Sequence, residues 1–131
     1  QSGHRRDLNR PQFKAAALAR RLDDPDSDAT AVLTTLRRAL SVRAELQALH
    51  PDSRLEVLSV DRVDRVVLRC SYQGDSLVAV HNFTASRLTF DPTLLGGHDD
   101  VVWVDRLSDQ QFAPRRRHAL EPYSVLWLVQ P

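Results

Sequence analysis

The hydrophobic positions between residues 28 and 50 repeat at the period of an α-helix. Its first predicted apolar face consists of Ala29, Val32, Leu33, Leu36, Leu40 and Ala44. A second, displaced face contains Val42, Leu46 and Leu49, so the far end is expected to be buried on two sides. The spacing therefore predicts one long helix that ends before Pro51 and is packed between two bodies.

A shorter helix is predicted before the long one. It begins near Pro11, runs to about Leu22, and has an apolar stripe of Phe13, Ala16, Ala17 and Leu18. Pro25 then breaks the helical pattern, and a residue of the acidic stretch 26–28 caps the long helix. This stretch lacks the glycine and the terminal glutamate of a calcium-binding loop, so capping is expected rather than cation binding.

From residue 54 onward the apolar period changes to two, which is typical of β-strands. Strands are predicted at 54–59, 66–72, 76–82, 87–90, 101–107, 119–120 and 124–129. The sequence Gln73-Gly74-Asp75 between the second and third strands predicts a hairpin. The expected fold class is α+β: a loop and two helices over 1–50, followed by an antiparallel β-sandwich over 51–131.

The charge balance excludes a strong positive electrostatic potential over the whole protein. The 131 residues contain 42% hydrophobic and 27% charged residues, with a net charge of +1. We therefore expect no nucleic-acid partner and no anionic membrane surface. The sequence has no apolar run of about 20 residues and no leader, which predicts a cytoplasmic protein.

Two further features of the composition concern processing and redox state. The chain contains no methionine and begins with Gln1, so we expect it to be a piece of a longer protein. Its single cysteine, Cys70, lies in an alternating strand pattern, which predicts a small buried thiol in a reducing compartment.

The strand region contains the stretches HNFTASRLTF, VVWVDRLSDQ and HALEPYSVLWL, the last with the closing residues Pro122, Tyr123 and Trp127. These three stretches resemble strands of the C-terminal sandwich of the alpha-amylase superfamily. The loop from Arg6 to Arg10 is similar to the Arg-Asp/Glu-x-Asn-Arg loop of sucrose phosphorylase-like members. Leu49-His50-Pro51 stands where many members have Phe-His-Pro, and this variant resembles the glucosylglycerate and sucrose 6'-phosphate phosphorylase branches.

The resemblance implies a part of an enzyme. Parents of this kind have a (β/α)₈ barrel and perform retaining glucosyl transfer between an α-glucoside and phosphate, using two carboxyl groups about 5 Å apart. The family's catalytic carboxylates precede this segment, so no catalytic residue, cofactor or metal is expected within it. Residues 1–50 would be the last loop and helices of the barrel, and the expected partners are the substrate, phosphate and the rest of that barrel.

Arg6 and Arg10 are the candidate substrate-binding residues. The resemblance implies that Arg6 reaches the glucose subsite beside an upstream carboxylate, where a planar guanidinium can hold a carboxylate and sugar hydroxyls together. Arg10 is expected to shape the loop by pairing with Asp7 or a barrel carboxylate. Composition alone would place both arginines in a solvated surface loop.

Other conspicuous side chains favour structural roles. Arg43 projects among the apolar positions of the long helix, so it is expected to need a buried carboxylate or carbonyl partner. The basic run 115–117 predicts a solvated loop, and Asn82-Phe83-Thr84 is a glycosylation sequon. The histidines, at positions 4, 50, 81, 98 and 118, show no metal-ligand spacing.

An alternative function is a non-catalytic β-sandwich that binds carbohydrate or a protein partner. Such a module should present Trp103 or Trp127 on an open face, where an indole can stack on a sugar. A phosphorylase segment should instead pack both indoles inward.

Overall fold

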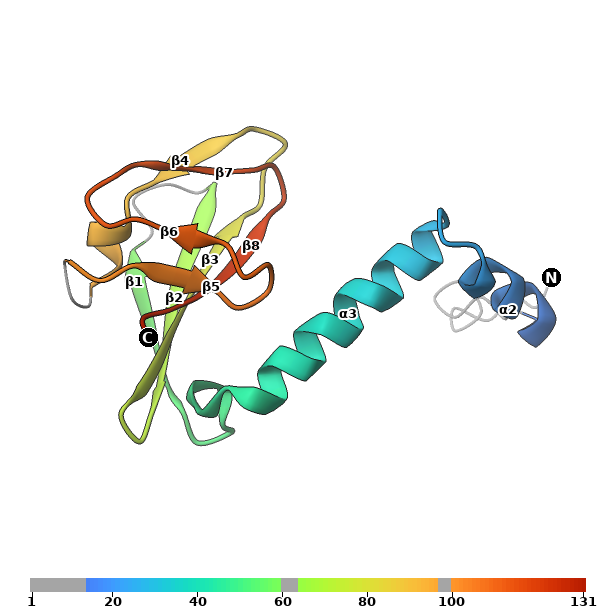
Figure 1. Ribbon diagram of the computed structural model, residues 1–131, viewed down its shortest axis with the longest axis horizontal. Helices are drawn as coiled ribbons and strands as arrows, with labels where there is room; N and C mark the ends of the chain where they lie inside the picture. Colours follow the sequence, from blue (N-terminus) through green and yellow to red (C-terminus); the bar gives the residue numbers. More distant parts are fainter. Residues whose placement is uncertain (1–13, 60–63, 97–99) are drawn as a thin grey trace, which may run out of the picture. The chain divides into compact units, whose positions relative to one another are not determined.

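A computed structural model describes residues 14–59, 64–96 and 100–131 of the chain. The chain divides into two compact units, residues 1–38 and 39–131. The described part of the first unit is helical, and the strands lie in the second unit (Figure 1). No helix in the described ranges is long and apolar enough to cross a membrane.

The first unit contains helix α2, Ala15–Asp23, and most of helix α3, Asp28–Glu45. Ser27 caps α3: its Oγ accepts a hydrogen bond of 3.1 Å from the Thr30 amide. The Thr30 hydroxyl donates to the carbonyl of Leu22 at 3.0 Å, which joins the start of α3 to the end of α2. The acidic stretch thus contains the predicted cap. The shorter helix begins at Ala15, after an extended Lys14, so its predicted start near Pro11 was wrong.

The long helix ends earlier than its sequence predicts. Leu46 adopts an extended conformation, φ −97° and ψ 106°, and a separate 3-10 helix η1 follows at Gln47–Leu49. This change of direction places Ala48, which is 2% exposed, against the sheet of the second unit. The prediction of one continuous helix to residue 50 was therefore wrong, because packing on the sheet overrides the helical period.

The two predicted apolar faces of α3 have different environments. Val42, on the second face, is 1% exposed, whereas Val32, Leu36 and Leu40 of the first face are 58%, 54% and 62% exposed. Arg43 is exposed as well, which corrects the expectation of a buried arginine. Within the described residues the helix is therefore buried on its second face and open on its first.

The second unit contains the strands. They are β1 Arg54–Ser59, β2 Arg65–Tyr72, β3 Asp75–Asn82, β4 Leu88–Phe90, β5 Trp103–Asp105, β6 Gln111–Phe112, β7 His118–Leu120 and β8 Val125–Val129. A 3-10 helix, η2, spans Pro92–Leu95 after β4. The strand predicted over 101–107 is shorter than expected, and β6 was missed because two residues are too few to show a period.

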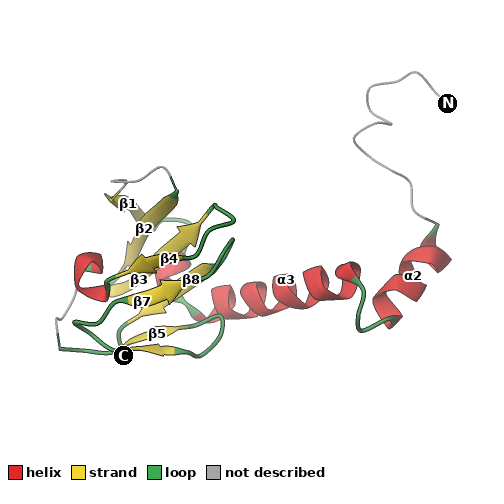
Figure 2. Ribbon diagram, turned by 90° about the horizontal axis from the view of Figure 1, so that it is seen from above, coloured by secondary structure: helices red, strands yellow, loops and turns green. Residues whose placement is uncertain are grey.

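The strands pair antiparallel in two sheets, as the sequence predicts (Figure 2). The larger has the order β1-β2-β3-β8-β5-β6, and the smaller is β4-β7. The C-terminal strand β8 thus lies between β3 and β5, two strands that are far from it in the sequence (Figure 1). It therefore joins two parts of the large sheet.

The predicted hairpin between β2 and β3 is confirmed. Tyr72 pairs with Asp75, which leaves Gln73 and Gly74 as the two loop residues, with φ of 49° and 94°. Positive φ at both positions is the type I′ geometry, whose twist matches that of the paired strands. A local sequence signal therefore determines this turn.

The main core lies between the two sheets. Val78, Val80 and Leu128 of the large sheet are fully buried, and Phe90 and Leu120 of the small sheet pack in the same cluster. Phe112 of β6 contacts Phe90 at 5.3 Å between ring centroids. This cluster is the sandwich interior predicted from the alternating pattern.

Candidate functional site

The candidate substrate-binding residues Arg6 and Arg10 lie outside the described residues. Their placement at a glucose subsite therefore stays a prediction. The described features with functional meaning are two buried polar side chains, a pocket, and the environment of the two tryptophans. All of these lie in the second unit.

Asp105, at the end of β5, is a buried polar centre that is 1% exposed. One carboxylate oxygen accepts from the Ser108 hydroxyl at 2.6 Å and the Ser108 amide at 3.1 Å. The other accepts from the Trp127 amide at 2.7 Å and the Leu107 amide at 3.3 Å. A single carboxylate therefore holds the turn after β5 and links it to β8.

Asn82 is a second buried centre and is 3% exposed. Its amide nitrogen donates to the carbonyls of Ser86 and Glu121, both at 2.8 Å, and its oxygen accepts from the Thr84 amide and hydroxyl, both at 2.9 Å. These bonds connect the end of β3 to the turn before β8. The same bonds use the atoms that glycosylation of the sequon would need, so the motif has a structural role here.

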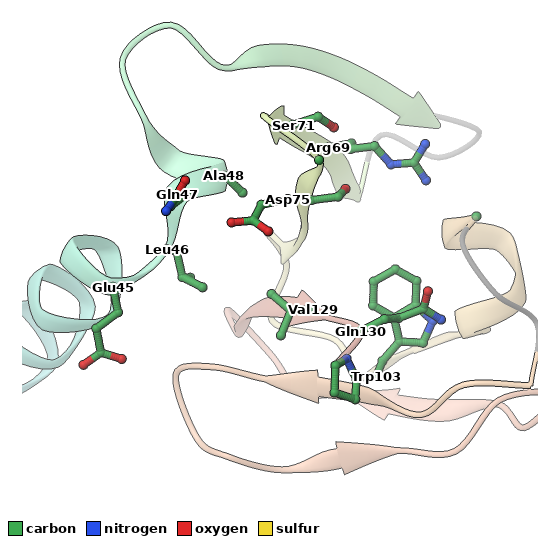
Figure 3. Close-up of a pocket in the computed structure, with 14 residues that line it drawn as sticks. Glu45, Leu46, Gln47, Ala48, Arg69, Ser71, Asp75, Trp103, Val129 and Gln130 are labelled. Atoms are coloured by element: carbon green, nitrogen blue, oxygen red, sulfur yellow. The ribbon is translucent and has the colours of Figure 1, made fainter.

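A pocket of about 630 Å³ opens in the second unit (Figure 3). Gln47 and Ala48 of η1 form one side, Arg69 and Ser71 come from β2, and Trp103 comes from β5. The remainder of the lining includes Glu45, Leu46, Gly74, Asp75, Ser76, Gly96, Val129, Gln130 and Pro131. Sequence reasoning missed this pocket, because its members come from segments with no common motif.

Two charged groups of this pocket are engaged within the fold. Arg69 donates to the carbonyl of Leu95, and a Cβ at residue 96 would lie 2.6 Å from its Nη2, so Gly96 admits the guanidinium. On another side of the pocket, Glu45 pairs with Arg106 at 2.9 Å. The other carboxylate of the lining, Asp75, belongs to the exposed hairpin end. These contacts favour structural roles for Arg69 and Glu45.

The two tryptophans occupy different environments. Trp103 is 6% exposed and belongs to the main core, as predicted for a phosphorylase segment. Trp127 is half-buried and packs against the second cluster, formed by Ala48, Leu77 and Ala79. Trp103 therefore does not present the open ring face that a sugar-binding module needs.

We expect acid to destabilise the second unit through His81. His81 stacks on Phe83, with ring centroids 5.7 Å apart, and burial lowers its pKa from 6.5. Near and below pH 6.5, the unfolded chain binds more protons at this histidine than the folded chain does. The contribution of the neutral His81 to the free energy of unfolding is therefore fully present above about pH 6.5. It is lost as the pH falls from there toward the pKa of His81 in the folded protein.

The measurement is the free energy of unfolding between about pH 5 and pH 8, the range in which a histidine charges. Replacing the imidazole in His81→Phe should flatten the slope near pH 6. His50→Gln, which removes a 44% exposed imidazole, is measured beside it for comparison. An unchanged slope in His81→Phe would show that another group causes the acid sensitivity.

The comparison with known families gives a match over about half of the chain. Residues 63–129 match the family model described as the C-terminal domain of amylosucrase. The matched range runs from the segment before β2 to the end of β8. It therefore includes both Asn82 and Asp105.

Two curated relatives match nearly the whole chain. Glucosylglycerate phosphorylase of Escherichia coli is 24% identical over 126 residues, which are 96% of this chain and 21% of that protein. Glucosylglycerate phosphorylase of Allomeiothermus silvanus is 29% identical over 129 residues, 98% of this chain and 20% of that protein. The chain thus spans about a fifth of the length of these relatives.

Solved structures share the fold. An Anoxybacillus alpha-amylase aligns with a TM-score of 0.63 and 14% identity, covering 82% of this chain and 24% of the amylase. Trehalulose synthase from Pseudomonas mesoacidophila aligns with a TM-score of 0.59 and 20% identity, covering 86% of this chain and 19% of the synthase. The family model and the two curated relatives confirm the resemblance to the alpha-amylase superfamily predicted from three sequence stretches, and the shared fold agrees with it. The match over residues 63–129, about half of the chain, shows that this chain belongs to the family of amylosucrase C-terminal domains.

Proposed function

We propose that this chain is the C-terminal segment of a retaining sucrose phosphorylase-like enzyme of the cytoplasm. The parent would transfer glucose between an α-glucoside and phosphate. The observation that carries the proposal is the match to two glucosylglycerate phosphorylases over 96% and 98% of this chain. That match extends beyond the sandwich family, which begins at residue 63, into the helical part.

The segment would have two tasks within the parent. Residues 1–50 would supply the last loop and helices of the (β/α)₈ barrel, including Arg6 and Arg10 at the substrate. Residues 51–131 would form a domain that braces that barrel. The exposed apolar positions Val32, Leu36 and Leu40 of α3 support this division, because a helix with an uncovered apolar face usually packs against another body.

The test compares the segment with its parent. We expect the purified 131-residue chain to release no glucose 1-phosphate from sucrose, sucrose 6'-phosphate or glucosylglycerate in phosphate buffer. The two-carboxylate machinery of retaining transfer is expected upstream of residue 1. The parent should release glucose 1-phosphate from at least one of the three substrates.

Two outcomes would contradict the proposal. Glucose 1-phosphate formed above a buffer blank by the segment alone would place the catalytic groups within it. A parent that hydrolyses these substrates to glucose, with no phosphate ester formed, would be a glycosidase rather than a phosphorylase. The comparison among the three substrates also identifies the α-glucoside that the parent cleaves.

A further inference from the structure

Strand β1 is an open edge of the large sheet. The strand order β1-β2-β3-β8-β5-β6 places β1 at one end, and in the described ranges no strand pairs with its outer side (Figure 2). The strand spans Arg54–Ser59, whereas the opposite edge strand, β6, spans only Gln111–Phe112. An unpaired edge has backbone donors and acceptors that can pair with another strand. The sheet can therefore be extended at β1.

The hairpin between β2 and β3 determines which backbone groups of β2 point toward β1. Tyr72 and Asp75 close a two-residue turn, so they form a hydrogen-bonded pair. Hydrogen-bonded and non-hydrogen-bonded pairs alternate along an antiparallel ladder. The N–H and C=O groups of Ser71 and Arg69 therefore point away from β3 and toward β1.

The strand β1 consequently has two sets of backbone groups. Arg54 and Glu56 are the β1 partners of those two residues, so their N–H and C=O groups face β2. Because the directions alternate along a strand, the N–H and C=O groups of Leu55 and Val57 face the open edge. The side chains of Leu55 and Val57 are 62% and 57% exposed, so a partner strand can reach this stretch.

The edge lacks the features that usually protect an edge strand. Proline, lysine and bulges commonly prevent pairing between the edges of natural sheets. Residues 54–59 contain neither proline nor lysine, and the irregularity of the ladder lies at the far end, between Val57 and Ser59. The stretch 54–57 pairs regularly with β2, so it has the regular backbone that a further strand requires.

The charges of β1 are complementary to those of a second copy of the same strand. If two copies run antiparallel about a twofold axis at Leu55, Arg54 of each copy lies opposite Glu56 of the other. Leu55 then forms a hydrogen-bonded pair with Leu55 of the second copy, and the Arg54–Glu56 pairs are of the non-hydrogen-bonded kind, in which side chains lie closest. Opposite charges in such cross-strand pairs are stabilising.

The charges also select this register over its neighbour. An axis at Glu56 would place two carboxylates opposite each other, which is destabilising. In this structure neither Arg54 nor Glu56 forms an ion pair with another described residue. Both side chains are exposed, so both are available to a second copy.

We propose that this protein self-associates through β1, with Leu55 on the twofold axis and an Arg54–Glu56 ion pair on each side of it. The contact joins the large sheets of two copies into one continuous sheet. Few residues take part, so the dimer is weak and forms in proportion to protein concentration. The inference goes beyond the proposed function and does not depend on the catalytic activity.

The test is a charge exchange, measured by sedimentation velocity of the 131-residue chain over a range of concentrations. The unaltered chain should sediment faster as its concentration rises. Arg54→Glu and Glu56→Arg should each weaken self-association by at least about tenfold, because each places like charges opposite one another. The double variant Arg54→Glu/Glu56→Arg restores opposite charges and should recover the association of the unaltered chain.

A mixture of the two single variants tests the register directly. One variant has only acidic side chains at positions 54 and 56, and the other has only basic ones. Each should be mainly monomeric alone, whereas an equal mixture should form a dimer that contains one copy of each. This exchange of partners is expected only if positions 54 and 56 of different copies lie opposite each other.

Two further variants test the backbone contact and a different surface. Leu55→Pro removes an amide that points to the open edge and keeps the bonds between β1 and β2, so it should be monomeric with little change in melting temperature. Leu36→Glu, at a 54% exposed position of α3, is the matched control and should leave self-association unchanged.

Three outcomes would overturn the inference. The first is a chain that stays monomeric at every concentration up to the millimolar range. The second is a dimer that both single charge reversals leave intact. The third is a dimer that Leu36→Glu abolishes and the charge reversals do not, since its contact would lie on α3. Sedimentation requires no active enzyme, so these outcomes are separate from the formation of glucose 1-phosphate.

Discussion

Asp105→Ala should lower the free energy of unfolding of the 131-residue chain by about 3–5 kcal/mol. The carboxylate is 1% exposed and accepts four hydrogen bonds, so its removal leaves the amides of Leu107, Ser108 and Trp127 without this acceptor inside the protein. The loss falls at the junction of β5 and β8, the strand that joins two parts of the large sheet. We expect chemical denaturation to show the change in its midpoint.

Two other variants make the result specific. Asp105→Asn keeps one acceptor oxygen, so it should lie between the wild type and Asp105→Ala. Asp100→Ala removes a carboxylate that pairs with Arg115 at 3.1 Å on the surface, and exposed pairs of this kind contribute about 0–1 kcal/mol. If Asp105→Ala and Asp100→Ala unfolded at the same denaturant concentration, Asp105 would not hold the turn.

Arg6→Ala should reduce the phosphorolysis rate of the parent enzyme by roughly 100- to 1,000-fold. If Arg6 pairs with a carboxylate at the glucose subsite and fixes the orientation of the sugar, this fold-change corresponds to about 2.7–4.1 kcal/mol of lost transition-state stabilisation. The fold should be largely retained, because the proposed contact is with the substrate and one upstream residue. Turnover and melting temperature measured together distinguish these two effects.

The other arginines of the chain provide graded controls. Arg6→Lys should restore part of the activity, since an ammonium group cannot reproduce the two-pronged geometry of a guanidinium. Arg10→Ala should act mainly on the stability of the loop. Arg115→Ala, at a side chain that is 67% exposed, should have almost no effect. Near wild-type turnover in Arg6→Ala would return Arg6 to the surface-loop interpretation.

The environments of the two tryptophans distinguish the proposed phosphorylase segment from the alternative, a carbohydrate-binding module. A carbohydrate-binding module needs an indole with an open ring face, whereas Trp103 is 6% exposed in the core and Trp127 packs beside η1. The most exposed aliphatic side chains lie instead on α3 and on the edge strand β1. Aliphatic surfaces suit contact with another folded body better than contact with a polar sugar.

The sequence by itself determined the features that depend on a few neighbouring residues. The alternating pattern predicted β2 and β3 to within one residue, and Gln73-Gly74 determined the turn between them. Ser27 at the start of α3 belongs to the stretch predicted to cap it. Motif similarity was also sufficient to identify the superfamily. In each case the signal is local, because periodicity, capping and turn geometry act within one element.

The tertiary structure decided which elements each residue contacts. The sequence gives no sign that β8 lies between β3 and β5, nor that Asp105 holds the turn beside it, because the partners are 22 residues apart in the chain. The end of α3 at Glu45 follows from the packing of Ala48 on Leu77 and Ala79, which overrides a helical period that continues to residue 50. Local patterns specify where side chains can be buried, but only the sheet and its covering elements determine which of them are.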